Sequence, residues 1–182
     1  MSEPIIQKIK TLAAAFAPDT IRVRQHLHAH PELSFQEHNT AAFVEEHLKE
    51  MGLQPQRMAE TGVVALIEGR NAAKKIIALR ADLDALPIQE KNEVAYKSKQ
   101  DGIMHACGHD VHTASVLGTA RILQELRQEF EGTVKLIFQP GEEKFPGGAS
   151  VMIKEGVLQN PAPQSIFGQH VFPLLPAGKV GF

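Results

Sequence analysis

The sequence predicts an α/β sandwich with a mostly parallel or mixed sheet. Short apolar runs typical of strands alternate with segments whose apolar residues recur every three or four positions, as in amphipathic helices. The chain has 182 residues, of which 43% are hydrophobic and 22% charged, as in ordinary globular domains. This length favours one domain with a substantial core.

Two early segments have the pattern of helices. Asp19 can cap a helix that runs through Leu27. A second helix is expected from about Thr40 to Met51, because its apolar residues fall on one face and Gly52 follows as a stop signal. Both segments therefore predict helices ahead of the first strand.

Two strand-like runs follow, at residues 63–67 and 75–80. A short loop that contains Gly and Asn joins them, and this pattern indicates a β-hairpin. Residues 87–102 are polar and irregular, and we expect a loop that leads the chain to His105.

The second half of the chain alternates helix and strand. Apolar residues recur at helical spacing over 110–130, and a buried strand is expected at 134–138. A short helix at 149–154 and a strand at 165–171 follow, and residues 180–182 read as the start of a further strand. This alternation is the basis of the predicted fold class.

Composition excludes several classes of function. The formal charge of −2 provides no field that attracts nucleic acid or an anionic membrane surface. No apolar run reaches the roughly 18 to 20 residues of a membrane helix, and the N-terminus lacks the pattern of a signal peptide. We therefore expect a cytoplasmic protein without nucleic-acid or membrane partners, whose single cysteine is a buried thiol, a metal ligand or a nucleophile.

Polar side chains follow the predicted strands at the point where each strand ends. Asp82 and Asp84 follow one strand, Glu142 and Glu143 another, and His170 a third. Ligands of open α/β sheets bind beyond the carboxyl ends of the strands. These five side chains are therefore expected at one rim.

Cys107 and His109 stand two residues apart at the start of a predicted helix. Gly108 between them permits a tight turn, so both side chains can reach one divalent ion, and the helix N-terminus should help to keep the thiol ionised. A small buried cysteine beside surface histidines is an equally open interpretation of this short motif. His105 and His112 are expected behind the ligands or in substrate binding.

The four carboxylates suggest different roles. Glu142 and Glu143 repel each other at a strand end, and a nearby cation offsets that cost. One of the pair can ligate a metal while the other takes a proton from water, although a solvated charged loop would show the same residues. Asp82 or Asp84 can orient a metal-binding histidine, and a loop-capping aspartate is the alternative.

Four further histidines are weaker candidates. His170 ends a predicted strand, where a structural role is more common than metal binding. His26, His28 and His30 point in different directions on a helix, and we expect them at the surface or in a loop.

Five stretches together resemble the amidohydrolase branch of the zinc aminoacylase/carboxypeptidase family, which includes hippurate hydrolases, auxin-conjugate hydrolases and N-acetyldiaminopimelate deacetylases. The resemblance covers essentially the whole chain, and the motifs stand in the family's order. They occupy residues 24–35, 80–87, 105–112, 141–143 and 169–171.

The resemblance implies a three-layer α/β/α sandwich of the zinc-dependent exopeptidase type, with a mixed sheet that is incomplete at the C-terminus. It implies two divalent metal ions (Zn, Mn, Co or Ni) and hydrolysis of the amide bond of N-acyl L-amino acids or small peptides. Glu142 would be the general base, and Asp84 would orient the site. The implied metal ligands are Cys107, His109, Glu143 and His170.

Members of this family are longer, with an inserted lid domain and a further histidine ligand. Residues 1–182 are therefore expected to be the N-terminal part of a metal-binding catalytic domain, weakly active or inactive alone, with any homo-oligomer formed through the lid. Two rivals remain open. One is a cysteine hydrolase with Cys107 as nucleophile and His109 or His112 as base, and the other is a non-catalytic binding module.

Overall fold

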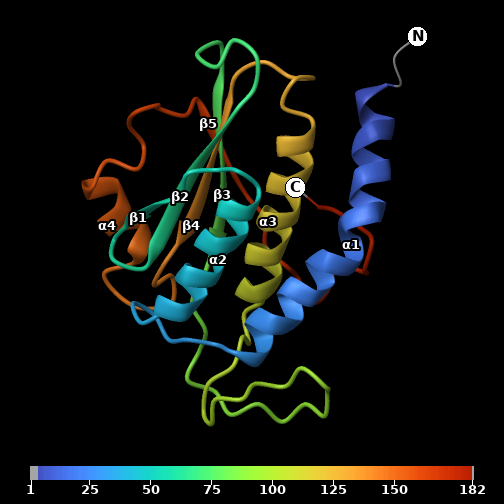
Figure 1. The fold of residues 1–182 in the computed structure, drawn as a ribbon. Helices are drawn as coiled ribbons and strands as arrows, with labels where there is room; N and C mark the ends of the chain where they lie inside the picture. The colour runs from blue at the N-terminus through green and yellow to red at the C-terminus, as the bar shows by residue number, and fades with distance from the viewer. Residues whose placement is uncertain (1–3, 182) are drawn as a thin grey trace.

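Two helices and two strands precede a part of the chain in which strands and helices alternate, within residues 4–181, which the computed structural model describes (Figure 1). The elements are α1 (Ile5–Ala29), α2 (His38–Glu50), β1 (Gln56–Met58), β2 (Gly62–Glu68), β3 (Ile76–Asp82), α3 (His109–Glu125), β4 (Thr133–Gln139), α4 (Gly148–Lys154) and β5 (Ser165–Gly168). The α/β fold class predicted from the sequence is confirmed.

The five strands form one mixed sheet in the order β1-β2-β4-β3-β5. β3 runs parallel to both β4 and β5, whereas β2 runs antiparallel to β4 and β1. The predicted hairpin is wrong, because β4 lies between β2 and β3. The two runs are neighbours in sequence, yet both form hydrogen bonds with β4, which comes more than 50 residues later.

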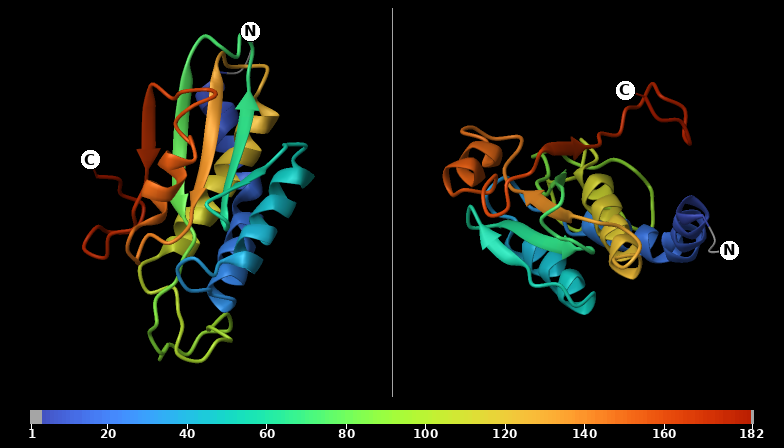
Figure 2. Two further views of the ribbon diagram at one scale, coloured as in Figure 1. Left: turned by 90° about the vertical axis from the view of Figure 1, so that its left-hand side faces the viewer. Right: turned by 90° about the horizontal axis from the view of Figure 1, so that it is seen from above.

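Helices cover both faces of this sheet, which makes three layers (Figure 2). α1, α2 and α3 lie on one face, where α2 and α3 pack against the larger hydrophobic core. α4 lies on the other face over a smaller core around Ile137 and Met152. Every residue of β4 is buried, as expected for a central strand that is covered on both sides.

The first helix is longer than predicted. It begins at Ile5, not at Asp19, and Pro18 lies within it. Proline disfavours a helix interior, but the hydroxyl of Thr20 donates to the carbonyl oxygen of Phe16 across this point. The α1–α3 contact also holds the helix in place.

The remaining elements agree with the predictions to within about two residues, except in four places. α3 ends at Glu125, before the predicted end at Phe130, and the short strand β1 was not predicted. β5 is an edge strand that pairs with β3, and it ends at Gly168, before the predicted end at residue 171. Residues 180 and 181 form no strand, and Phe182 lies outside the described residues. No helix within residues 4–181 combines the length and the apolarity that crossing a membrane requires.

Candidate metal centre

The carboxyl ends of three parallel strands bring the expected side chains to one edge of the sheet. Asp82 is the last residue of β3, and Asp84 lies two positions beyond it. Glu142 and Glu143 follow β4, and His170 follows β5. Because β3, β4 and β5 are parallel, these ends meet at the same edge, and the start of α3 lies beside them.

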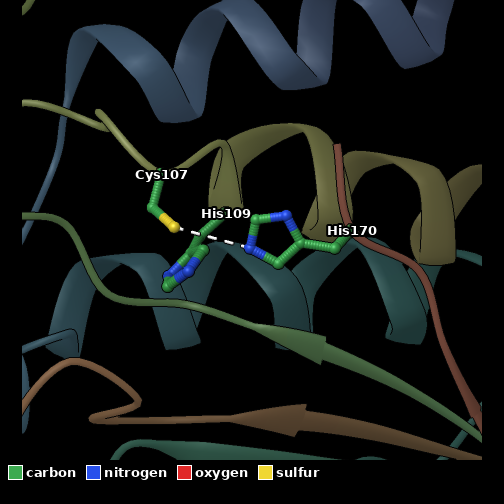
Figure 3. Close-up of side chains that lie close together, drawn as sticks. All are labelled: Cys107, His109 and His170. Atoms are coloured by element: carbon green, nitrogen blue, oxygen red, sulfur yellow. Dashed lines mark hydrogen bonds between the residues drawn. The ribbon is translucent and has the colours of Figure 1, made fainter. Parts of the chain in front are cut away.

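Cys107, His109 and His170 form the first group that can hold a metal ion (Figure 3). Their candidate ligand atoms all lie within 4.8 Å of one another, and Cys107 Sγ is 3.5 Å from His170 Nε2. Gly108 has a φ of +86°, and a Cβ there would lie 2.3 Å from Cγ2 of Val171. Only glycine therefore suits the turn between the thiol and His109, as the sequence led us to expect.

His109, Glu142 and Glu143 form a second group with the same close spacing. The Nε2 atom of His109 is buried and has no hydrogen-bond partner within residues 4–181, and it lies 3.8 Å from Oε1 of Glu143. A buried nitrogen without a partner is costly, and it needs a ligand. The two groups overlap at His109, so the donor set, with thiolate, imidazole and carboxylate atoms, fits divalent ions such as zinc.

The acidic surroundings oppose ionisation of the free thiol. Burial raises the pKa of Cys107 to about 11, and Glu143 and Glu142 add to this effect. The expectation that the helix N-terminus keeps this thiol ionised is wrong for the metal-free site, because burial and the neighbouring carboxylates together outweigh the helix dipole. A divalent cation reverses that balance and deprotonates a coordinating thiol.

Asp84 connects the metal ligands with the glutamate turn. His109 Nδ1 lies 2.8 Å from the backbone oxygen of Asp84 and 3.2 Å from its Oδ1. Oδ2 accepts hydrogen bonds from Ser34 Oγ (2.6 Å) and from the backbone N–H of Glu143 (2.9 Å). Burial alone would raise the pKa of Asp84, but the hydrogen bonds from His109, Ser34 and the backbone N–H groups of the glutamate turn hold it at about 2.

Asp82 and His112 form a buried support beneath this site. Asp82 Oδ1 lies 2.6 Å from His112 Nδ1, and Oδ2 accepts a hydrogen bond from Arg80 at 2.6 Å. His112 Nε2 accepts from the backbone N–H of Val171, next to His170. Although the ligand atoms of Asp82, His112 and His109 also lie within 4.8 Å, the first two already have hydrogen-bond partners. They therefore support the ligand loops.

His105 and His28 lie in a buried polar cluster beyond the ligand loop. His105 is only 6% exposed, burial lowers its pKa to about 4, and neither ring nitrogen has a partner in the described structure. The expectation of a surface position is wrong for His28, whose ring lies between Asp110 (2.9 Å) and Glu90 (3.0 Å). Both partners are distant in sequence, so no local pattern indicated this burial.

Sequence reasoning also missed Ser34 and Glu37, which are both buried and bonded to the strand-end loops. They lie within or just beyond the early stretch 24–35 that contributed to the family resemblance. Ser34 and the acids Glu32 and Glu37 stand among apolar residues there, and this was the available signal.

Three comparisons relate the chain to known proteins. Residues 78–182 match the family described as peptidase family M20/M25/M40. An N-acyl-L-amino acid amidohydrolase of Geobacillus stearothermophilus is 47% identical over 176 residues, which are 96% of this chain and 47% of that protein. An N-acetylcysteine deacetylase of Bacillus subtilis (strain 168) is 48% identical over 171 residues, which are 92% of this chain and 43% of that protein.

A solved structure shares the fold at high sequence identity. The YXEP protein of Bacillus subtilis, described as a dinuclear metal binding peptidase from the M20 family, superimposes with a TM-score of 0.84 at 47% identity. The match covers 90% of this chain and 45% of that chain. The chain thus spans less than half the length of these relatives.

Proposed function

The chain belongs to peptidase family M20/M25/M40, and on this premise we propose that the protein hydrolyses the amide bond of N-acyl amino acids with two divalent metal ions. The proposed substrates follow the named activities of two relatives, an N-acyl-L-amino acid amidohydrolase and an N-acetylcysteine deacetylase. We further propose that residues 1–182 supply the first part of a metal-binding catalytic domain.

The buried Nε2 atom of His109 is the observation that carries this proposal. It has no partner among the described residues, and it faces a thiol and carboxylates at the edge of the sheet. The other ring nitrogen, Nδ1, is hydrogen-bonded to Asp84, and this contact directs Nε2 at the site. This carboxylate–histidine arrangement is the usual support of a metal-binding histidine.

Four residues would hold the ions in this proposal: Cys107, His109, Glu143 and His170. Zinc, manganese, cobalt or nickel ions, when bound, lower the pKa of water and polarise a carbonyl group. Glu142 takes the proton of the attacking water and delivers it to the leaving nitrogen of the amide. Its carboxylate lies within 4.8 Å of the ligand atoms of Glu143 and His109, which suits this division of work.

The cysteine-nucleophile rival finds no support in the site. A nucleophilic thiol needs a lowered pKa and a hydrogen-bonded base, but the pKa of Cys107 is raised to about 11. The histidine within hydrogen-bond distance of the thiol is His170, and not His109 or His112, the two bases of this rival; both ring nitrogens of His112 are engaged by Asp82 and Val171. Nor does this rival give Glu142 a role.

The test uses the complete protein that carries this sequence, assayed against N-acetyl and N-benzoyl amino acids with zinc, manganese, cobalt and nickel. Glu142→Gln should reduce kcat on the order of 100- to 10,000-fold while the bound metal remains. Lys144→Gln serves as the matched control, because Lys144 is an exposed residue of the same turn. It should keep its activity.

Two results would overturn the proposal. Normal turnover by Glu142→Gln would show that Glu142 is not the general base. Activity that survives complete metal removal by a chelator would show that the reaction does not need the metal. Stoichiometric metal binding without hydrolysis of any compound in the panel would favour the binding-module alternative.

A further inference from the structure

The turn that carries Glu142 is held by hydrogen bonds to the peptide groups on either side of it. The backbone N–H of Gly141 donates to Glu37 Oε1 at 2.7 Å, and the backbone N–H of Glu143 donates to Asp84 Oδ2 at 2.9 Å. The turn lies between β4 and α4, outside both elements. Two carboxyl groups from distant segments therefore fix the backbone on both sides of the proposed base.

Glu37 is completely buried, with a relative exposure of 0%, and it lies 104 residues from Gly141 in sequence. Its second oxygen, Oε2, accepts a hydrogen bond from Thr61 Oγ1 at 2.6 Å. Lone buried acids are rare in proteins because their desolvation is costly. Here both oxygens have partners, and one partner is the backbone of the glutamate turn.

The position of Glu37 in its own helix supports a role in the turn. Glu37 is the N-cap residue of α2, yet its side chain makes no capping hydrogen bond. Glu32 binds the first backbone N–H groups of that helix instead, those of Asn39 and Thr40. Because Glu32 performs the capping, the carboxyl group of Glu37 is free to reach Gly141.

The ring of Phe35 packs against the same turn. Gly141 has a φ of +52°, and a Cβ there would lie 2.5 Å from Cζ of Phe35. The ring of Phe35 thus lies directly against the backbone before Glu142. Phe35 itself has a φ of 63°, an uncommon value for a residue other than glycine. The segment before α2 therefore contacts the turn through both a hydrogen bond and a ring.

We propose that Glu37 is a positioning residue that directs the Glu142 carboxylate through the backbone of Gly141. This inference rests on the proposed function, in which Glu142 is the general base. A base must lie within hydrogen-bond reach of the proton that it takes, and a displacement of about 1 Å costs on the order of 100-fold in rate. Among the described residues, the Glu37 side chain forms hydrogen bonds with Thr61 and Gly141 and with none of the proposed metal ligands, whereas Asp84 contacts both His109 and Glu143.

Mutation can therefore separate the effect of the Glu37 carboxyl group from that of the Asp84 carboxyl group. Glu37→Ala in the complete, metal-loaded protein should lower kcat on the order of 10- to 100-fold, with KM and metal content unchanged. Glu37→Gln should retain most activity, because its amide oxygen accepts from Gly141 and its NH₂ group donates to Thr61. A purely structural role of the negative charge would not give this rescue.

A second measurement needs neither substrate nor metal. The amide hydrogen of Gly141 should exchange with solvent faster in Glu37→Ala than in the wild type or in Glu37→Gln, as followed by NMR. Lys135→Met is the matched control, because Lys135 is also buried but its amine donates to backbone oxygens of Val157 and Gln159. It should change neither kcat nor Gly141 exchange.

Wild-type kcat in a folded Glu37→Ala, or a Glu37→Gln as slow as Glu37→Ala, would overturn the proposal. If Glu37→Ala fails to fold, Thr61→Val provides the test, because it removes the hydroxyl that holds Oε2. It should lower kcat and speed Gly141 exchange in the same direction, and no change in either would also overturn the proposal. Retained activity in Glu142→Gln, in contrast, would refute the proposed function, so the two failures are distinguishable.

Discussion

Asp84 offers the most direct test of the geometry at the metal centre, through the change Asp84→Asn. Its pKa falls from 3.8 to about 2 in the folded chain. At about 1.4 kcal/mol for each pKa unit, the ionised carboxylate contributes about 2 kcal/mol to the free energy of unfolding. The side chain is buried, so solvent screening does not reduce this figure much.

The sign of the pH dependence follows from the lowered pKa. The unfolded chain binds the proton more readily than the folded chain, so the contribution is complete above about pH 5 and is lost as the pH falls toward 2. About half of it should remain near pH 3. Asp84→Asn should therefore lose about 2 kcal/mol near pH 7, and its deficit should shrink as the solution becomes more acidic.

Urea unfolding of the metal-free chain, followed by circular dichroism from about pH 7 to about pH 3, measures this deficit. Asp19→Asn is the control, because the carboxylate of Asp19 is more exposed and bonds to Arg121 at the surface. It should have little effect. No deficit near pH 7, or a deficit of constant size down to pH 3, would refute the assigned hydrogen bonds. With metal, the same variant should bind zinc on the order of 10- to 100-fold more weakly.

Three further changes test other groups whose pKa values are shifted. The free thiol of Cys107 has a pKa of about 11, so it must release a proton when it binds zinc at neutral pH, and Cys107→Ser should reduce the number of protons released. Calorimetry in buffers of different ionisation enthalpy counts these protons. An unchanged count would contradict a thiolate ligand. Asp110 and then Glu90 raise the pKa of His28 against the effect of burial, so the protonated ring stabilises the fold fully below pH 6.5, and this stabilisation is lost as the pH rises through the raised pKa. His28→Gln should remove it, so the free energy of unfolding should fall across that pH range in the wild type and not in the variant. An equal fall in both proteins would contradict the role of His28. Burial lowers the pKa of Lys135, so the wild type should become more stable as the pH rises toward 10.5 and the buried amine loses its proton. Lys135→Met should show no such gain. A gain of equal size in both proteins would show that another group is responsible.

The strand-end positions were predictable from the sequence because they depend on local pattern and one general rule. The apolar runs that became β3 and β4 are continuous, as buried parallel strands require. Polar residues directly after such strands lie at one edge of the sheet. Asp84 and Glu143 could thus be placed near each other, although 59 residues separate them.

Pairing and burial that depend on distant residues could not be predicted in this way. The loop between β2 and β3 has the composition of a hairpin, but β4 pairs with both strands and separates them. His28 looked like a surface residue until Asp110 and Glu90 enclosed it. In both cases the deciding partner lies more than 50 residues away along the chain, beyond the reach of a periodic pattern.

The arrangement of these contacts explains why a stretch without proposed metal ligands accompanies the ligand motifs. Ser34 donates to Asp84, which orients His109, and Glu37 binds the peptide before Glu142. Loss of the first contact would disturb metal binding, whereas loss of the second would leave the metal and move the base. The segment between α1 and α2 therefore affects both metal binding and the position of the proposed general base. It does so through hydrogen bonds to other residues and not through contact with substrate or metal.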